Sequence, residues 1–234
     1  IIIGRGKMGT LLKDSASAHG HEVIAMADVA NQDEVKPLEC DAVIDFSHPD
    51  NLGWVCDYVQ THGCIYICGT TGLNEEQKQL LRRTARSCPV FYSANFSYGI
   101  AMLEKMLEQV TPLLKEDFDM EVVETHHDQK QDAPSGTAAM LVEAMDPDHA
   151  FKRVYGREGF VGKRGKEIGI HAIRGGTVAG EHTVLYLGQD ESLKITHTAS
   201  SRMIFVNGAW KALAFMAKRP NGYYTMKDLT GEEQ

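Results

Sequence analysis

The sequence predicts an α/β protein with a doubly wound parallel sheet, followed by a second α+β domain with a mixed or antiparallel sheet. Through about residue 95, short β-like runs alternate with longer helix-compatible segments, which indicates parallel strands joined by right-handed crossovers. After residue 165, three β-like runs follow one another without a helical pattern between them, which favours hairpin connections. The change from alternating strands and helices to consecutive strands predicts two domains in 234 residues.

Each expected element follows from a run of the sequence. The parallel strands are expected at residues 1–3, 23–27, 42–46, 64–68 and 90–92. From Ser97 to Leu114, apolar residues recur at helical spacing, so a long helix with one apolar face is expected to open the second domain. The later strands are expected at residues 168–174, 182–188 and 192–199. A helix over 207–217 follows, and we expect it to return to the first domain.

The composition argues against several classes of function. Lys plus Arg number 24 against 32 Asp plus Glu, and this net charge of -8 argues against nucleic acid as a partner. The apolar runs are far shorter than the roughly 20 residues of a membrane span, and the amino terminus lacks a signal-peptide pattern. The five cysteines form no C-x-x-C pair, so a reducing compartment and a cytoplasmic protein are expected. The chain opens at Ile1 within an apolar run, so a short amino-terminal piece is expected to be missing.

The residues after the first expected strand form a glycine-rich loop. Gly4, Gly6 and Gly9 have the spacing G-x-G-x-x-G, with Lys7 and Met8 between the last two glycines. Such a loop allows a tight turn, a close approach of backbone to a pyrophosphate, and close packing of helix on strand. It predicts a Rossmann-like domain that binds a nicotinamide dinucleotide through these residues. The alternative is three glycines that serve only the turn and the packing.

The second expected strand ends at a residue that bears on the choice of cofactor. There Asp28 can accept hydrogen bonds from the adenosine ribose hydroxyls and repel a 2′-phosphate, which favours NADH. Lys7 is the one cation expected close enough in sequence to meet that phosphate. We therefore predict a modest preference for NADH, with NADPH also used.

Two further loops follow the fourth and fifth expected strands, at the edge of a parallel sheet where ligands bind. The expected cofactor-binding residues are Gly69, Thr70 and Thr71 in the first loop and Ser93, Ala94, Asn95 and Phe96 in the second. A plain turn is the alternative for each loop. The expected dinucleotide-binding domain comprises residues 1–96 and 207–234, and residues 97–206 form the second domain.

The second domain contains a cluster of polar residues between a β-like run and a helix-like run. Two adjacent histidines, His126 and His127, precede Lys130, which offers a positive charge for a carboxylate or a proton for a reaction. A Ser-Gly-Thr sequence at residues 135–137 then opens a helix. The first N–H groups of a helix and the positive end of its dipole suit an anion. The cluster therefore predicts a site for an anionic ligand.

These residues belong to a longer pattern, E-x-x-E-x-H-H-x-x-K-x-D-A-P-S-G-T-A, which begins at Glu121 and ends at Ala138. With "GTTG", "SANFSYG", "RGGTVAGEHTV" and "ITHTASSR", it extends over nearly the whole chain. The chain resembles the dihydrodipicolinate reductases, which are the 4-hydroxy-tetrahydrodipicolinate reductases of bacterial and plant lysine biosynthesis. This resemblance implies an NADH- or NADPH-dependent reduction of a cyclic dicarboxylic imine to tetrahydrodipicolinate in the diaminopimelate and lysine pathway.

The resemblance also implies roles for individual residues. It makes His126 the proton donor, with Lys130 assisting catalysis, and a histidine suits proton transfer because its side chain ordinarily titrates at about pH 6.5. Substrate binding is expected at His127, Ser135, Gly136 and Thr137. Members of this family assemble as homotetramers through the sheets of the second domain, so a homotetramer is expected here.

Several alternatives remain open on the sequence alone. Adjacent histidines chelate a metal poorly from a strand, and no second ligand cluster follows, so no metal site is expected. His171 and His182 are expected to be ordinary strand residues, and His197, on the same face as Leu193 and Ile195, is expected to be a core or interface histidine. Arg174 and Arg202 could reach an anionic ligand, although an arginine at a sheet edge is usually solvated or paired. The alternative functions are a dinucleotide-sensing binding protein on the same scaffold and a reductase of a different small cyclic acid.

Overall fold

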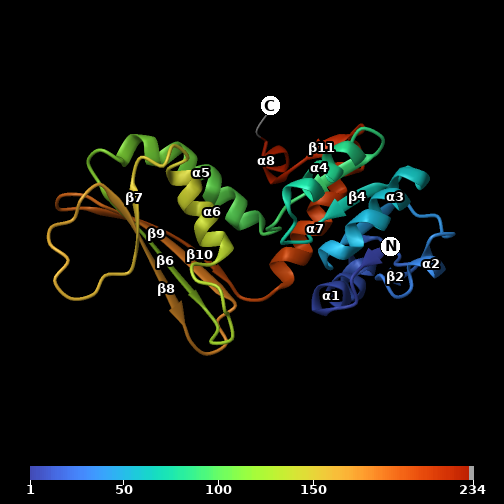
Figure 1. Cartoon of the computed structure of the whole chain (residues 1–234), viewed down its shortest axis with the longest axis horizontal. Helices are drawn as coiled ribbons and strands as arrows, with labels where there is room; N and C mark the ends of the chain where they lie inside the picture. Colours follow the sequence, from blue (N-terminus) through green and yellow to red (C-terminus); the bar gives the residue numbers. More distant parts are fainter. Residues whose placement is uncertain (232–234) are drawn as a thin grey trace. The chain divides into compact units, whose positions relative to one another are not determined.

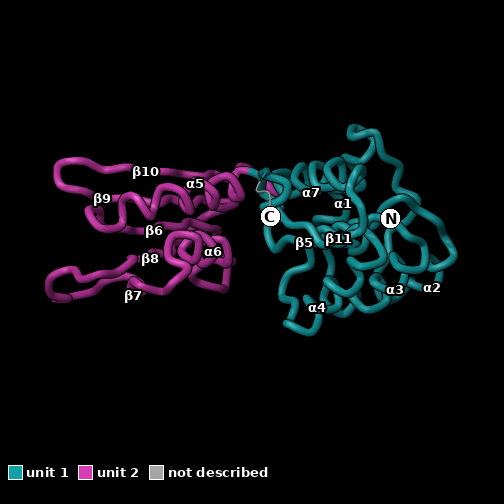
Figure 2. Tube along the Cα trace, turned by 90° about the horizontal axis from the view of Figure 1, so that it is seen from above, with its two compact units in different colours: residues 1–98, 203–234 teal, residues 99–202 magenta. Residues whose placement is uncertain are grey.

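The computed structural model describes residues 1–231, and the chain divides into two compact units. The first unit comprises Ile1–Tyr98 and Met203–Gln234, and the second comprises Gly99–Arg202 (Figure 2). Each unit has its own sheet and its own hydrophobic core.

The first unit contains a six-stranded sheet in the order β11-β5-β4-β3-β1-β2, and all of its strand pairs are parallel. Its strands are β1 (Ile2–Ile3), β2 (Met26–Ala27), β3 (Ala42–Asp45), β4 (Ile65–Cys68), β5 (Pro89–Tyr92) and β11 (Gly222–Tyr224). The five predicted strands are confirmed, and β11 is an addition that the sequence did not predict. Strand order reverses at β1, which lies between β2 and β3. The carboxyl ends of strands at such a reversal form the usual ligand-binding edge of an open α/β sheet.

The helices of the first unit connect these strands (Figure 1). They are α1 (Lys7–Ala16), α2 (Gln32–Val35), α3 (Leu52–His62), α4 (Glu75–Thr84), α7 (Met203–Met216) and α8 (Met226–Leu229), with short 3-10 turns at Ser17–His19 and Pro49–Asn51. The predicted final helix is present and begins earlier than expected, at Met203. The indole N–H of Trp210 donates to the Ser15 hydroxyl at 2.9 Å, so α7 packs against α1. Helix α7 therefore belongs to the first unit.

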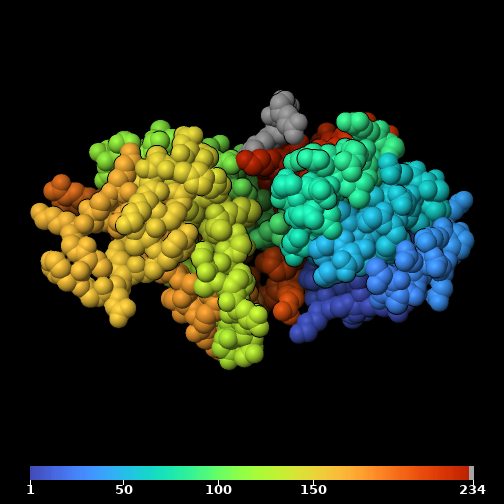
Figure 3. Space-filling model, viewed as in Figure 1, coloured from blue at the N-terminus to red at the C-terminus, as the bar shows by residue number. Residues whose placement is uncertain are grey.

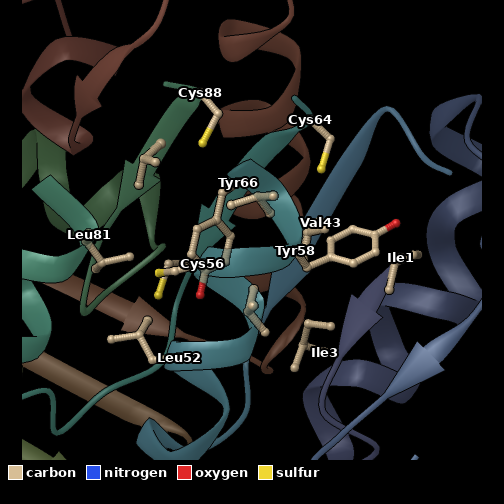
Figure 4. Close-up of a cluster of buried hydrophobic side chains, with 14 of the residues drawn as sticks. Ile1, Ile3, Val43, Leu52, Cys56, Tyr58, Cys64, Tyr66, Leu81 and Cys88 are labelled. Atoms are coloured by element: carbon tan, nitrogen blue, oxygen red, sulfur yellow. The ribbon is translucent and has the colours of Figure 1, made fainter. Parts of the chain in front are cut away.

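The core of the first unit is rich in sulfur-containing side chains. Cys56, Cys64 and Cys88 are buried among aliphatic residues and Tyr66 (Figure 4). Burial raises the pKa of Cys56 to about 12, so its thiol stays protonated at neutral pH. These cysteines serve the fold as small hydrophobes.

The second unit contains a five-stranded mixed sheet in the order β10-β9-β6-β8-β7. Its strands are β6 (Asp119–His126), β7 (Lys152–Tyr155), β8 (Glu167–Arg174), β9 (Gly180–Leu187) and β10 (Ser192–Ala199). The central strand β6 is antiparallel to β9 and parallel to β8, so the predicted mixed sheet is confirmed. Strand β7 was not predicted. The segment that joins β7 to β8 lies at the surface (Figure 3). Its Phe160 is fully exposed.

Two helices, α5 (Tyr98–Leu114) and α6 (Gly136–Met145), cover one face of the second sheet (Figure 1). Leu107 of α5 and Leu141 of α6 are fully buried against Met120 and Val122 of β6. We call this the covered face of the sheet. Because side chains alternate along a strand, the residues between these positions, such as Glu121, point to the opposite, uncovered face.

Candidate active site

Strand β6 carries two polar side chains onto the covered face of the second sheet. Met120 and Val122 are apolar, and the next two positions on that face are Glu124 and His126 at the end of the strand. Glu124 is completely buried and His126 is 9% exposed. His127 lies just beyond the strand. The two adjacent histidines therefore have different surroundings.

The carboxylate of Glu124 is held by four hydrogen bonds. Arg174 forms a bidentate pair with it, with both nitrogen–oxygen distances 2.8 Å. The backbone N–H of Ser135 donates to Oε1 at 3.0 Å, and His126 Nδ1 lies 2.5 Å from Oε2. Burial disfavours the charged form, but the bonds from Arg174, His126 and Ser135 outweigh it and lower the pKa of Glu124. Glu124 is therefore ionised at neutral pH.

The two ring nitrogens of His126 have different neighbours: Nδ1 is hydrogen-bonded to Glu124, and Nε2 lies beside a glycine. Nδ1 contacts the ionised Glu124, so this nitrogen carries a proton. Nε2 lies beside Gly180, where an added Cβ would come within 3.0 Å of it. A glycine at this position leaves room around Nε2. The atom available for proton transfer is thus Nε2.

His182 is a site residue that sequence reasoning missed. Its Nε2 lies 3.0 Å from the hydroxyl of Ser135, and its ring meets the ring of His126 edge-on with 5.1 Å between centroids. Burial lowers the pKa of His182 to about 4, and the neighbouring His126 adds to the effect. The imidazole of His182 is therefore neutral at pH 7. The signal that could have found it is strand register, since His182 pairs with Glu124 across β6 and β9.

Lys130 lies in the loop between β6 and α6 and is held by a neighbouring carboxylate. Its ammonium group lies 2.8 Å from Asp132 Oδ1, and this bond lowers the pKa of Asp132. The carbonyl of Asp132 accepts a hydrogen bond from Arg174 at 2.7 Å. The Lys130 side chain is 21% exposed, so it is positioned but still accessible. Arg174 therefore connects the Lys130 loop to Glu124.

The remaining expected substrate-binding residues lie around this network. Ser135 is the N-cap of α6, and its hydroxyl accepts a hydrogen bond from the N–H of Ala138 at 3.1 Å. Gly136 and Thr137 are the first two helical residues, where backbone N–H groups and the helix dipole favour a carboxylate. The carbonyl of His127 accepts the Lys130 N–H at 3.2 Å. The ring of His127 makes no hydrogen bond within residues 1–231.

The glycine loop of the first unit has the close packing that a dinucleotide site requires. A Cβ on Gly9 would lie 1.9 Å from the carbonyl oxygen of Gly4, so only glycine fits there. Gly4 has φ +102, which is unfavourable for other residues. Gly6 is the N-cap of α1 without any side-chain cap, and Lys7 and Met8 form the first helical positions. The N–H groups of this turn can therefore receive a phosphate.

The cation beside Asp28 is Arg5. The Arg5 Nε lies 3.7 Å from Asp28 Oδ2, and the other carboxylate oxygen accepts the N–H of Ala30 at 2.9 Å. The expectation that Lys7 is the only nearby cation is wrong, because Arg5 from the same loop reaches the end of β2. Two opposite charges thus stand where the adenosine ribose is expected.

Part of the loop after β4 is buried and hydrogen-bonded within the first unit. Thr70 is buried, and its hydroxyl donates to Asp45 Oδ1 at 2.8 Å and accepts the N–H of Ser47 at 3.1 Å. Tyr66 donates to the same buried carboxyl at 2.8 Å. The expected cofactor contact through the Thr70 side chain is therefore corrected, since its hydroxyl is already used. A Cβ on Gly69 would collide with the ring of Phe46 at 2.5 Å.

Only part of the loop after β5 is exposed to solvent. Phe96 is 1% exposed and packs against two other phenylalanine rings, so its side chain belongs to the core and does not face a cofactor. Ser93 and Asn95 form a local turn, in which the Ser93 hydroxyl donates to the Asn95 carbonyl at 2.6 Å. Ala94 is exposed beside them, as is Thr71 in the preceding loop. The exposed residues remain candidates for cofactor contact.

The fold and these two sites define a class of protein. A parallel sheet with an uncapped glycine loop at its strand reversal is typical of a nicotinamide-dinucleotide domain. A buried carboxylate–histidine pair beside a lysine and a helix N-terminus can bind an anion and supply a proton. Within residues 1–231, no three metal-ligating side chains cluster, and no helix is long and apolar enough to cross a membrane. The class is a two-unit dinucleotide-dependent reductase.

Comparison with known proteins identifies the family. Residues 1–96 match the family "Dihydrodipicolinate reductase, N-terminus", and residues 99–230 match "Dihydrodipicolinate reductase, C-terminus". The 4-hydroxy-tetrahydrodipicolinate reductase of Alkaliphilus metalliredigens is 38% identical over 229 residues, which cover 97% of this chain and 95% of that protein. The enzyme of the same name from Clostridium tetani is 37% identical over 234 residues, covering 94% and 92%. The chain belongs to the dihydrodipicolinate reductase family, and it is an NAD(P)H-dependent oxidoreductase of the lysine and diaminopimelate pathway.

Solved structures agree with this fold. The dipicolinate-bound dihydrodipicolinate reductase from Paenisporosarcina sp. TG-14 superposes with a TM-score of 0.74 at 20% identity, covering 96% of each chain. A probable dehydrogenase from Thermotoga maritima gives a TM-score of 0.62 at 9% identity, covering 97% of this chain and 91% of that one. At these identities the likeness concerns the fold alone.

Proposed function

We propose that the second unit binds 4-hydroxy-tetrahydrodipicolinate and that His126 supplies the proton for its reduction to tetrahydrodipicolinate. The observation that carries this proposal is the orientation of His126, whose Nδ1 is fixed by buried Glu124 while Nε2 lies beside the side-chain-free Gly180. The solved reductase from Paenisporosarcina sp. TG-14 binds dipicolinate, a planar dicarboxylate of the same class as the proposed substrate.

The residues of the first unit fit a nicotinamide dinucleotide. The close contact of Gly9 with Gly4 and the uncapped first turn of α1 form a cradle for the pyrophosphate. The Asp28 carboxylate suits the ribose hydroxyls, and exposed Thr71 and Ala94 are available to the remainder of the cofactor. The bound cofactor supplies the hydride for the reduction.

The residues of the second unit then carry out binding and proton transfer. The N–H groups of Gly136 and Thr137 receive one carboxylate at the start of α6, and His127 contributes to substrate binding beside them. Lys130 brings a positive charge to the same loop, which stabilises the dicarboxylate and the negative charge that develops during reduction. The 4-hydroxyl group of the substrate leaves as water. His126 donates its Nε2 proton to the ring that has received the hydride, and its Nδ1–H stays hydrogen-bonded to Glu124.

A direct assay tests this function. NADH oxidation should proceed with freshly generated 4-hydroxy-tetrahydrodipicolinate, and pyridine-2,6-dicarboxylate should inhibit it competitively. A dinucleotide-sensing protein would bind NADH without turning over the substrate. A reductase of another cyclic acid would oxidise NADH only with that acid. Either result would contradict the proposed substrate.

Cofactor choice is expected to depend on Arg5. Its guanidinium lies beside Asp28, and a 2′-phosphate of NADPH can pair with it while Asp28 repels the phosphate. We therefore predict a modest preference for NADH and a selective loss of NADPH affinity in Arg5→Ala. Both side chains are partly exposed, so the loss should be about 1 kcal/mol at most, or several-fold in KM.

Lys7→Ala is the matched control for Arg5→Ala, because Lys7 lies in the same loop but is not paired with Asp28. Steady-state KM values for NADH and NADPH should be compared for the wild type and both variants. An equal loss for the two cofactors in Arg5→Ala, or a selective NADPH loss only in Lys7→Ala, would show that Arg5 does not contact the 2′ position.

We further propose a cytoplasmic homotetramer assembled through the uncovered face of the second sheet. Helices α5 and α6 lie on the other face, and the uncovered face presents Ile173 and Leu187, which are 50% and 39% exposed. All five cysteines are free, as a reducing compartment requires. Sedimentation velocity reports the number of chains, and a monomer at assay concentration would contradict the assembly.

A further inference from the structure

Arg174 has no role in the mechanism proposed above. We infer that Arg174 is a positioning residue for both proposed catalytic groups, His126 and Lys130, and that it acts through Glu124 and Asp132. The inference rests on the proposed roles of His126 and Lys130.

Arg174 has no terminal N–H group left for a substrate. Nη1 donates to Glu124 Oε2 at 2.8 Å and to the carbonyl of Ile173 at 2.7 Å. Nη2 donates to Glu124 Oε1 at 2.8 Å and to the carbonyl of Asp132 at 2.7 Å. These four bonds use all four terminal N–H groups of a guanidinium. The remaining N–H, on Nε, has no partner among the described residues but is buried, so Arg174 does not serve as the anion-binding arginine that the sequence left open.

One branch of this arrangement reaches His126. Arg174 and the N–H of Ser135 occupy three of the four acceptor positions of the Glu124 carboxylate, and His126 Nδ1 takes the fourth. The carboxylate cannot rotate without breaking several charge-assisted bonds. Its orientation fixes the plane of the His126 ring and keeps a proton on Nδ1, as a carboxylate does in other catalytic histidine pairs. Proton exchange with the substrate is thereby confined to Nε2.

The other branch reaches Lys130. The bond from Arg174 to the Asp132 carbonyl fastens the loop to the end of β8, and the Asp132 carboxylate lies 2.8 Å from the Lys130 ammonium group. The Asp132 side chain is 60% exposed, so the ion pair itself contributes little to stability. Its effect is to place Lys130 relative to a backbone that Arg174 holds. A single guanidinium thus sets the positions of the proposed acid and the proposed cation.

The uncovered face of the same sheet offers a matched comparison. There Glu121 accepts a bidentate pair from Arg157 at 3.1 and 2.8 Å, and His171 Nε2 lies 2.7 Å from the same carboxylate. This group resembles the Glu124 group in its strand position, its bidentate arginine and its histidine, but Glu121 also accepts from a second arginine, Arg164, at 3.4 and 3.3 Å. Within residues 1–231, the hydrogen bonds of Glu121, Arg157 and His171 do not reach the loop that carries Lys130. Arg157→Lys therefore imposes the same chemical change without the proposed positioning role.

The experiment compares Arg174→Lys with Arg157→Lys, because lysine keeps the charge but loses the bidentate geometry. We expect Arg174→Lys to lower kcat by roughly tenfold, with a smaller change in KM, and to shift the pH dependence of kcat/KM. We expect Arg157→Lys to keep the wild-type kcat and pH profile. Equal kinetic behaviour of the two variants would overturn the inference. Circular dichroism establishes that both are folded, and sedimentation velocity establishes that Arg157→Lys, on the uncovered face, keeps the wild-type assembly.

A second measurement does not depend on the folding of any Arg174 variant or on turnover. In wild-type protein with ¹⁵N-labelled histidine, the neutral ring of His126 should carry its proton on Nδ1, and the resonance is assigned by its loss in His126→Gln. A neutral ring protonated on Nε2 would overturn the inference. If His126→Gln instead keeps wild-type turnover, the proposed function fails. If that variant is inactive while Arg174→Lys is kinetically normal, only the inference fails.

Discussion

Replacement of His126 by Gln is expected to lower kcat by roughly a hundredfold or more, which is the usual contribution of a general acid. The amide N–H of glutamine can still donate a hydrogen bond to ionised Glu124, so the buried carboxylate keeps a partner, but glutamine cannot deliver a proton. Lys130→Ala should have an effect of similar size, because it removes the positive charge beside the proposed substrate site. Dinucleotide binding should survive in both variants, since both residues lie outside the first unit.

Two other histidines make this prediction specific. His171→Gln changes a strand histidine that is also bonded to a glutamate, yet it lies on the uncovered face, and kcat should remain at the wild-type value. His127→Gln should raise KM for the substrate more than it lowers kcat, because His127 is proposed to bind and not to donate. Stopped-flow and steady-state NADH oxidation measure these effects. The proposed mechanism would be abandoned if His126→Gln and Lys130→Ala both retained wild-type turnover.

The strands that could be predicted from the sequence are those with a clear apolar signal. The runs at β1 and β3 to β5 are nearly continuous in apolar residues, as expected for strands covered on both faces. Strand β11 has only three residues, Gly222–Tyr224, and follows Pro220, so its short run resembles a turn. Strand β7 begins with Lys152 and Arg153 and has no apolar alternation. Both are specified by pairing with a longer neighbour, which local periodicity does not reveal.

In the site, too, features formed by residues close in sequence could be predicted, whereas contacts between distant residues could not. The glycine loop and the His-Lys loop could be predicted because their residues are close together in sequence. The bond between Glu124 and Arg174 joins residues 50 positions apart, and it depends on the register of β6 and β8. Thr70 and Phe96 were assigned correctly to loops at the ligand-binding edge, but the direction of each side chain is set by buried partners. Sequence position therefore located the loops and not the orientation of their side chains.

His182 is expected to make the stability of the second unit depend on pH between about 4 and 6.5. Burial lowers the pKa of His182 from its ordinary 6.5 to about 4 in the folded protein. Between these values the unfolded chain binds a proton that the folded protein does not, so acid favours unfolding. The contribution is fully present above pH 6.5 and is lost as the pH falls to 4. A difference of this size corresponds to on the order of 3 kcal/mol.

The prediction is tested by urea denaturation of wild type, His182→Gln and His48→Gln from pH 7 to pH 4.5. Glutamine can still bond to Ser135 but does not titrate, so the His182 variant should lose less stability on acidification than the wild type. Glu124, whose lowered pKa also favours acid unfolding, is common to all three proteins, so the difference between the curves isolates His182. His48 has a side chain that is 71% exposed, so His48→Gln should follow the wild-type curve. Parallel curves for wild type and His182→Gln would mean that His182 is not the neutral buried imidazole that its contacts with Ser135 and His126 indicate.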